Sequence, residues 1–183
     1  CFDTNSVVSL DSTDANCSDS GSGSESAPFC AFSAAIAAIS GSGVVRVTGN
    51  GTYIEKVTIP TGTEYAIVVE GNSTIQGVNG DSAIEAQSGS FLYLSGANVS
   101  LNGGTRGVET TAATAWIDET RIRSASLFGV FATSSSAVVL RNSRVSDNSG
   151  GGVSLSGGMM TIENTAIGYN GQGGSTPGLS LNG

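Results

Sequence analysis

Acidic and basic side chains in the second half of the chain recur at nearly constant spacing. Asp118, Arg141 and Glu163 are separated by 23 and 22 residues, and Arg121 and Arg144 each follow three residues after the first two. If successive units stack, these carboxylate and guanidinium groups lie side by side. The cluster then either grips an acidic sugar or forms a solvated ladder of cross-strand ion pairs that adds little stability. We favour the charge ladder as the simpler interpretation.

The composition narrows the chemistry that the chain supports. It has no His, which excludes Ser-His-Asp and Cys-His catalysis and His-ligated zinc. Its 7 basic and 15 acidic residues give a formal net charge of -8, which disfavours nucleic acid and anionic lipid surfaces as partners. We therefore expect no cofactor, no metal and no nucleic acid, and we assign no catalytic residue.

Aromatic side chains offer a different kind of site. Tyr93, Trp116, Phe128, Phe131 and Tyr169 are spread over the same part of the chain as the charged residues. They either form a platform on which sugar rings stack or pack inside and at the corners of the fold. We favour packing for most of them.

An internal repeat must position all of these groups. Residues 117–122, 140–145 and 162–167 share one pattern, and each segment is followed by Gly and a second short apolar run. Such units cannot bury their apolar faces alone, but stacked units can, through parallel strand pairing. The repeat therefore predicts an all-β fold, a parallel β-helix with about 22–24 residues per coil. A leucine-rich repeat is the alternative, but its fixed Leu positions and helical segment are missing.

Asparagines recur with the same period. Asn142 precedes Asn164 by 22 residues, and Asn148 precedes Asn170 by 22 residues. We expect their amides to form internal ladders that satisfy the backbone of the turns.

The first part of the chain differs from the rest. Residues 1–27 form an acidic, Ser/Gly-rich tail, and residues 28–183 form the predicted β-helix domain. Within this domain, residues 28–40 are predicted to form a helix that covers the open end of the first coil. Ser26 and Pro28 are start signals, and Phe32, Ile36 and Ile39 give the helix one apolar stripe.

Residues 28–59 resemble the opening of bacterial right-handed parallel β-helix proteins of the pectin-lyase-like superfamily: a capping helix, a strand, then Gly-Thr-Tyr-x-Glu and another strand. Residues 142–148 and 164–170 are similar to the coil consensus of that superfamily. The resemblance implies a right-handed β-helix in a secreted bacterial protein. It leaves function open, because lyases, hydrolases, adhesins, phage fibres and structural proteins share this fold.

One segment is similar to a catalytic motif of that superfamily. Residues 115–119 look like the Trp-Ile-Asp-His motif of pectate lyases, but Glu119 stands in place of the His. The accompanying Arg-x-Pro-x-x-Arg pattern is missing. We therefore expect that the chain is not an enzyme, and a fragment of a polysaccharide lyase or hydrolase is the last alternative.

Three cysteines, Cys1, Cys17 and Cys30, indicate a secreted protein with one unpaired thiol. We favour a disulfide between Cys17 and Cys30, with Cys1 bonded to either of them as the alternative. A leftover Cys1 is free, attached to a lipid anchor, or crosslinked to another chain.

Apolar residues near both ends suggest assembly. Val7, Val8 and Leu10 form a short β-like run that can add to a sheet edge of its own chain or of a neighbour. Leu179 and Leu181 lie in a strand that is followed by no cap.

These features together predict a non-catalytic structural protein, extracellular or on the outer cell surface, whose copies associate end to end into a fibre or layer. The alternative is an adhesin module that binds a surface polysaccharide.

Overall fold

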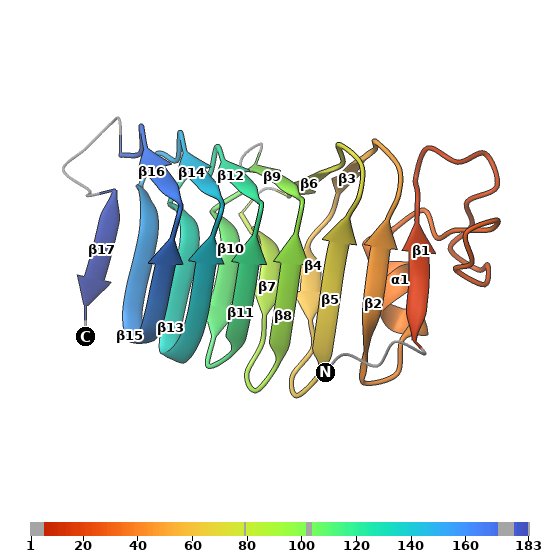
Figure 1. The fold of residues 1–183 in the computed structure, drawn as a ribbon, viewed down its shortest axis with the longest axis horizontal. Helices are drawn as coiled ribbons and strands as arrows, with labels where there is room; N and C mark the ends of the chain where they lie inside the picture. Colours follow the sequence, from red (N-terminus) through yellow and green to blue (C-terminus); the bar gives the residue numbers. More distant parts are fainter. Residues whose placement is uncertain (1–5, 79, 102–103, 172–177, 183) are drawn as a thin grey trace.

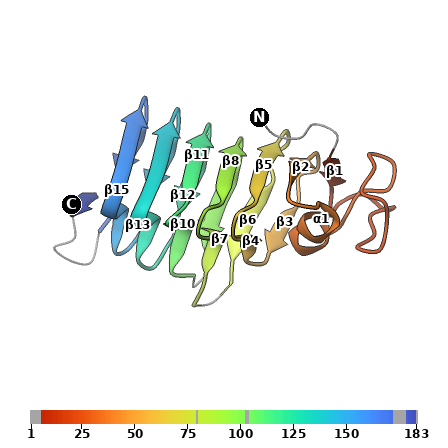
Figure 2. The ribbon, with the colours of Figure 1, turned by 90° about the horizontal axis from the view of Figure 1, so that it is seen from below.

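A computed structural model describes residues 6–78, 80–101, 104–171 and 178–182. The strands stack side by side from the N-terminal to the C-terminal end of an elongated body, as in a parallel β-solenoid (Figures 1 and 2). All pairings between the named strands are parallel, and each coil contributes one short strand to a sheet of six strands. The predicted all-β parallel β-helix is confirmed.

Three faces run along the solenoid. The first face consists of β1 (Val7–Leu10), β2 (Ser42–Val47), β5 (Glu64–Val69), β8 (Phe91–Ser95), β11 (Thr114–Asp118) and the second halves of β13 (Phe128–Arg141) and β15 (Gly151–Glu163). The second face consists of β3 (Thr52–Ile54), β6 (Thr74–Gly77), β9 (Asn98–Leu101), β12 (Arg121–Arg123), β14 (Arg144–Ser146) and β16 (Ala166–Gly168). The third face consists of β4 (Val57–Ile59), β7 (Ser82–Ala86), β10 (Arg106–Thr111), the first halves of β13 and β15, and β17 (Leu179–Asn182).

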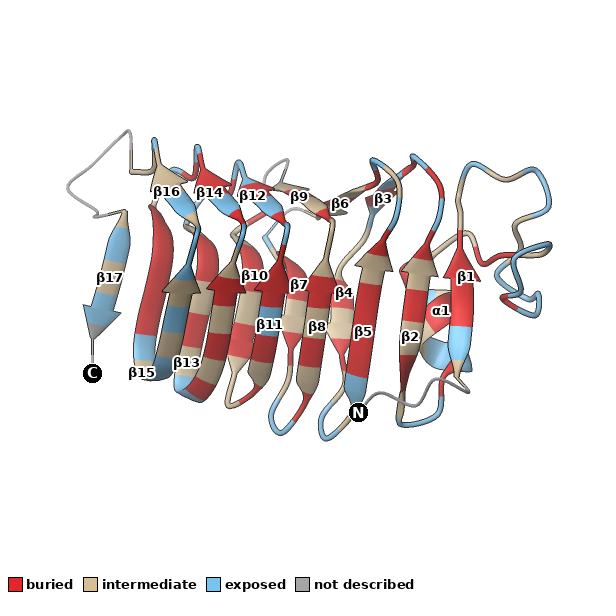
Figure 3. Ribbon diagram, viewed as in Figure 1, coloured by how far each residue is buried: buried red, intermediate tan, exposed pale blue. Residues whose placement is uncertain are grey.

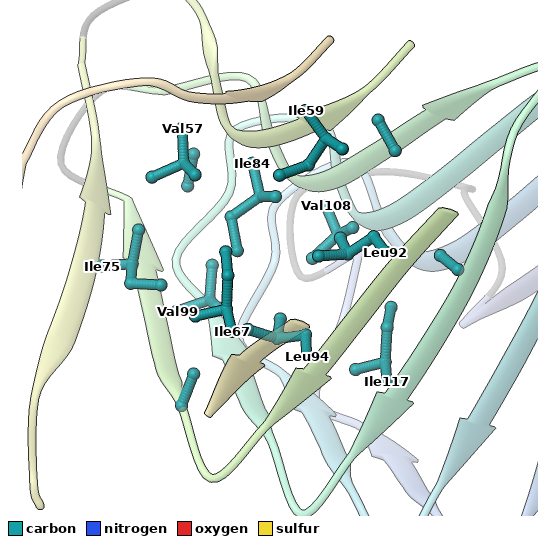
Figure 4. Close-up of a cluster of buried hydrophobic side chains, with 14 of the residues drawn as sticks. Val57, Ile59, Ile67, Ile75, Ile84, Leu92, Leu94, Val99, Val108 and Ile117 are labelled. Atoms are coloured by element: carbon teal, nitrogen blue, oxygen red, sulfur yellow. The ribbon is translucent and has the colours of Figure 1, made fainter. Parts of the chain in front are cut away.

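The core lies between the three faces and is built from rows of like residues. Leu94, Ile117 and Leu140 are register partners on β8, β11 and β13, and all three are fully buried. Successive strand residues alternate between buried and more exposed, which gives the banded strands of Figure 3. Side chains from different faces meet in the interior, as Ile75, Ile84 and Leu94 do in Figure 4. Each coil is therefore stabilised mainly by its neighbours.

The N-terminal helix α1 spans Phe32–Ala38, so the predicted range 28–40 is too long at both ends. Residues 28–31 are held in extended structure because Phe29 forms a parallel bridge with Leu10. The helix begins where the Glu55 carboxylate accepts hydrogen bonds from the backbone N–H groups of Phe32 and Ser33, at 2.7 and 3.0 Å. This cap comes from the coil below and not from the predicted start signals.

The described part of the tail belongs to the solenoid, which places no division at residue 27. β1 pairs in parallel with β2 and is the first strand of the first face. Its outer edge is occupied by the chain that follows it, since the Ser9 N–H donates to the Gly23 carbonyl at 2.7 Å and the Phe29 N–H donates to the Ser9 carbonyl at 2.9 Å. A disulfide between Cys17 and Cys30 closes this covering segment. The predicted Cys17–Cys30 pairing is therefore present, and Cys1 lies outside the described residues.

The strand expected to mediate assembly is largely used inside the chain. Leu10 is fully buried and Val8 is 9% exposed, because both face the core beneath α1 and β2. As assembly residues, Val8 and Leu10 are a wrong prediction, and only Val7 of this strand offers an exposed surface. The described residues contain no helix long and apolar enough to cross a bilayer.

Candidate functional site

The predicted charge ladder is divided between two faces. Asp118, Arg141 and Glu163 are register partners on the first face. Arg121 and Arg144 are register partners on the second face. A tight turn separates the two rows, and Asn142 adopts a left-handed conformation there with φ of 49°. Residues three apart in sequence therefore point from different faces.

On the first face, one ion pair forms. Arg141 donates from Nη2 to Asp118 Oδ2 at 2.9 Å, and Asn142 donates from Nδ2 to Asp118 Oδ1 at 2.9 Å. Burial acts to raise the pKa of the Asp118 carboxyl, but the hydrogen bonds from Asn142 and Arg141 outweigh it and lower that pKa below its usual value. Among the described residues Glu163 makes no ion pair, so the predicted ladder is one pair and not a continuous row.

Aromatic side chains lie beside this ion pair. Trp116 is 45% exposed on β11 and has Tyr93 of β8 and Val139 of β13 as its register partners. The Phe91 ring meets the Trp116 ring edge-on, with centroids 5.8 Å apart and planes inclined at 63°. We call Phe91, Tyr93 and Trp116 the aromatic face. Tyr93 also contacts Arg141, because Asp118 and, to a smaller degree, Tyr93 raise the pKa of Arg141.

The other predicted platform residues lie elsewhere. Phe128 and Phe131 stack on each other on β13, with centroids 5.7 Å apart, and the Arg106 guanidinium lies 4.2 Å from the centre of the Phe131 ring. Tyr169 follows β16 and is exposed. Sequence reasoning missed Phe91, although its spacing of two residues from Tyr93 places both side chains on the same side of a strand.

A groove of ≈ 390 Å³ opens on the second face. We call it the arginine groove, because Arg121, Arg123 and Arg144 line it together with Asn98, Ser146 and Asp147. Within the described residues, none of its three arginines pairs with a carboxylate, and Arg144 Nε donates to Ser146 Oγ at 3.4 Å. Sequence reasoning missed Arg123, which alternates with Arg121 along β12 and therefore shares its side of the strand.

The model of one protein family, described as "Right handed beta helix region", matches residues 40–176. The chain belongs to the right-handed β-helix family. No curated protein and no solved structure matches it. Membership explains the parallel coils but does not assign an activity, since function in this β-helix depends on the residues that its faces display.

The third face of this β-helix carries a charged cluster that sequence analysis did not single out. Lys56 Nζ lies 3.0 Å from Asp81 Oδ1 and 2.9 Å from Glu85 Oε2, and Arg106 Nη1 lies 3.1 Å from Glu109 Oε1. The hydrogen bond with Glu85 is the main cause that raises the pKa of Lys56. Since each carboxylate already has a cation of the same chain, the cluster serves to join neighbouring coils.

The remaining predicted residues lie at the ends of the β-helix. Leu179 and Leu181 are exposed on β17, next to β15. In the part of the chain that the structure describes, no three His, Cys, Asp or Glu side chains are grouped to hold a metal ion. The asparagine ladders are present: Asn148 Nδ2 donates to Asn170 Oδ1 at 2.9 Å, and the outer pair, Asn164 Nδ2 to Asn142 Oδ1, is longer at 3.5 Å.

Proposed function

We propose that this β-helix is a non-catalytic, extracellular module that binds a surface polysaccharide through its aromatic face. The observation that carries the proposal is the exposed Trp116 ring, with Tyr93 and Phe91 around it and the Asp118–Arg141 ion pair two residues along the strands. The apolar faces of pyranose rings pack on aromatic rings, while charged and amide groups at the rim hydrogen-bond their hydroxyls. A flat sheet face suits an extended glycan.

The state of Asp118 supports binding over catalysis. Its two carboxylate oxygens already accept hydrogen bonds from Asn142 and Arg141, and the pKa of the carboxyl is lowered. A general acid needs the opposite shift, towards neutral pH. The disulfide between Cys17 and Cys30 supports an extracellular or outer-surface location, since oxidising compartments preserve such bonds.

Intrinsic fluorescence tests the proposal directly, because Trp116 is the only tryptophan of the chain. We expect soluble neutral polysaccharides (a β-glucan, a mannan and a galactan are the probes) to include one that shifts or quenches this emission on titration. By calorimetry, Trp116→Ala should weaken that interaction at least tenfold, the scale of losing a central aromatic anchor. Tyr169→Ala, which removes an exposed aromatic ring on the second face, should bind as the wild type does. Unchanged emission with all three probes, or equal binding by Trp116→Ala, contradicts the proposal.

End-to-end self-association is a second candidate function. It is supported by the apolar surface of the last coil, where Leu181 is 58% exposed and Met159 and Leu179 are also exposed. It has less support than glycan binding, because the β1 edge at the opposite end is already covered by residues 23 and 29. A lipid anchor or an intermolecular crosslink at Cys1 stays a prediction.

Light scattering with and without reductant tests self-association. We expect particles larger than one chain that become smaller in the Leu181→Glu variant, and also smaller with reductant if Cys1 crosslinks neighbours. A single-chain size for the wild type in both buffers is the contrary result.

A further inference from the structure

The positive charges of this acidic protein are unevenly used. The chain has 7 basic residues and a formal net charge of -8. In the described residues four of the cations form ion pairs with carboxylates of the same chain: Arg46, Lys56, Arg106 and Arg141. The other three are Arg121, Arg123 and Arg144, and all three line the arginine groove. The cations without a carboxylate partner are therefore gathered at one place.

The strand register fixes how the three side chains start. Arg121 and Arg144 are direct partners on the parallel strands β12 and β14, so their backbones are about 4.8 Å apart. Arg123 leaves the same side of β12 about 6.6 Å further on, because the intervening Ile122 is fully buried. Three exposed guanidinium groups thus extend from the corners of one small triangle over the groove.

Like charges placed directly opposite each other on neighbouring strands destabilise a sheet. The row that holds Arg121 and Arg144 supplies no compensating acid, since its neighbours are Asn98 on β9 and Ala166 on β16. Asp147 lines the groove and reduces its net charge from +3 to +2. The groove therefore retains a repulsion that an anion removes on binding.

We propose that the arginine groove binds a tetrahedral oxyanion, a sulfate or phosphate ester carried by a glycan. A single guanidinium fork satisfies the two oxygens of a carboxylate, whereas three forks converging from different strands match the three outward oxygens of an ester. Asn98 and Ser146 add neutral hydrogen-bonding groups to the same groove. The site lies on the second face, so it stands or falls independently of the aromatic face.

Binding of defined polymers tests the proposal. The probes are dextran sulfate and poly(glycerol phosphate), which distinguish sulfate from phosphate esters, with unmodified dextran, polygalacturonate and duplex DNA for comparison. We expect at least one ester polymer to bind at low salt, at least tenfold more tightly than polygalacturonate, and to weaken as salt rises. Arg144→Gln should lose at least tenfold in affinity. The charge-matched control Arg46→Gln, which removes a cation on the first face, should stay within twofold of the wild type.

A thermal readout separates binding from a structural role. Without ligand, Arg144→Gln should melt at the same temperature as the wild type or higher, because the repulsion with Arg121 is removed. The ester polymer should raise the melting temperature of the wild type and of Arg46→Gln but not of Arg144→Gln. Equal binding by Arg144→Gln overturns the proposal, and so does polygalacturonate or DNA binding as tightly as both ester polymers.

Discussion

The inner asparagine ladder offers a prediction whose size follows from individual hydrogen bonds. Asn148 is fully buried, and its Oδ1 accepts from the Ala125 N–H at 2.9 Å while its Nδ2 donates to Asn170 Oδ1 at 2.9 Å. In Asn148→Ala, the Ala125 N–H loses its partner in a region without exposed surface. Asn170 Oδ1 keeps an N–H donor, the backbone amide of residue 148, at 3.1 Å. One buried donor is therefore left unsatisfied.

The expected loss can be assembled from these contacts. An unsatisfied buried N–H costs about 1–3 kcal/mol. The space left by the amide adds about 1 kcal/mol where the surrounding coil does not collapse into it. We therefore expect Asn148→Ala to lower the free energy of unfolding by about 2–4 kcal/mol, a large fraction of the stability of a domain of this size.

Urea unfolding followed by far-ultraviolet circular dichroism measures this loss. The matched control is Asn72→Ala, since Asn72 is exposed and its side chain makes no hydrogen bond with the described residues. The control should change the free energy of unfolding by no more than about 0.5 kcal/mol. A loss below about 1 kcal/mol for Asn148→Ala, with an unchanged dependence on urea, would refute the assignment of the ladder as a buried and fully used network.

Two further perturbations test the N-terminal cover and the first face. Replacing both Cys17 and Cys30 by Ser removes a crosslink across a sequence separation of 13 and should lower the free energy of unfolding by about 3 kcal/mol in the loop-closure picture; an effect below about 1 kcal/mol in urea unfolding would show that the covering segment unfolds separately. Because the pKa of Asp118 is lowered in the folded chain, its stabilising contribution is complete above about pH 4 and is lost as pH falls through that lowered pKa. Asp118→Asn should therefore flatten the acid side of the stability profile, and a profile as steep as that of the wild type would show that other carboxyls cause it.

The repeat alone was enough to predict the strand register in the second half of the chain. Coils of constant length bring residues 22 or 23 positions apart next to each other, so the partnership of Asp118 with Arg141 followed from counting. The partnership of Asn148 with Asn170 followed in the same way. Such predictions succeed because each coil of a solenoid contacts only its neighbours.

The N-terminal region shows where counting along the sequence ends. The start of α1 depends on Glu55, which lies 23 residues from Phe32 and belongs to no repeat pattern. The covering segment likewise depends on Asp19, whose Oδ1 accepts from the Cys30 N–H at 3.0 Å. Local start signals at Ser26 and Pro28 were outweighed, since tertiary contacts decide between weak local preferences.

The candidate sites were partly missed for a different reason. A search for identical residues at repeat positions finds Arg121 with Arg144 but passes over Arg123, whose register partner is Ser146. Phe91 was missed in the same way, because its partner on β11 is Thr114. What joins such residues is a shared side of the sheet, which depends on strand alternation and register and not on residue type.

The turn between the first and second faces explains why the two clusters differ in charge. Asp118 and Arg121 are three residues apart, but the turn directs them from different faces, so each belongs to a row of its own. The row of Asp118 contains the arginine that neutralises it. The row of Arg121 contains a second arginine and neutral neighbours, which leaves its charge unbalanced. In a solenoid, the composition of each row thus decides whether a cluster of charges holds coils together or remains available to a ligand, and on this chain the second outcome is confined to the arginine groove within the described residues.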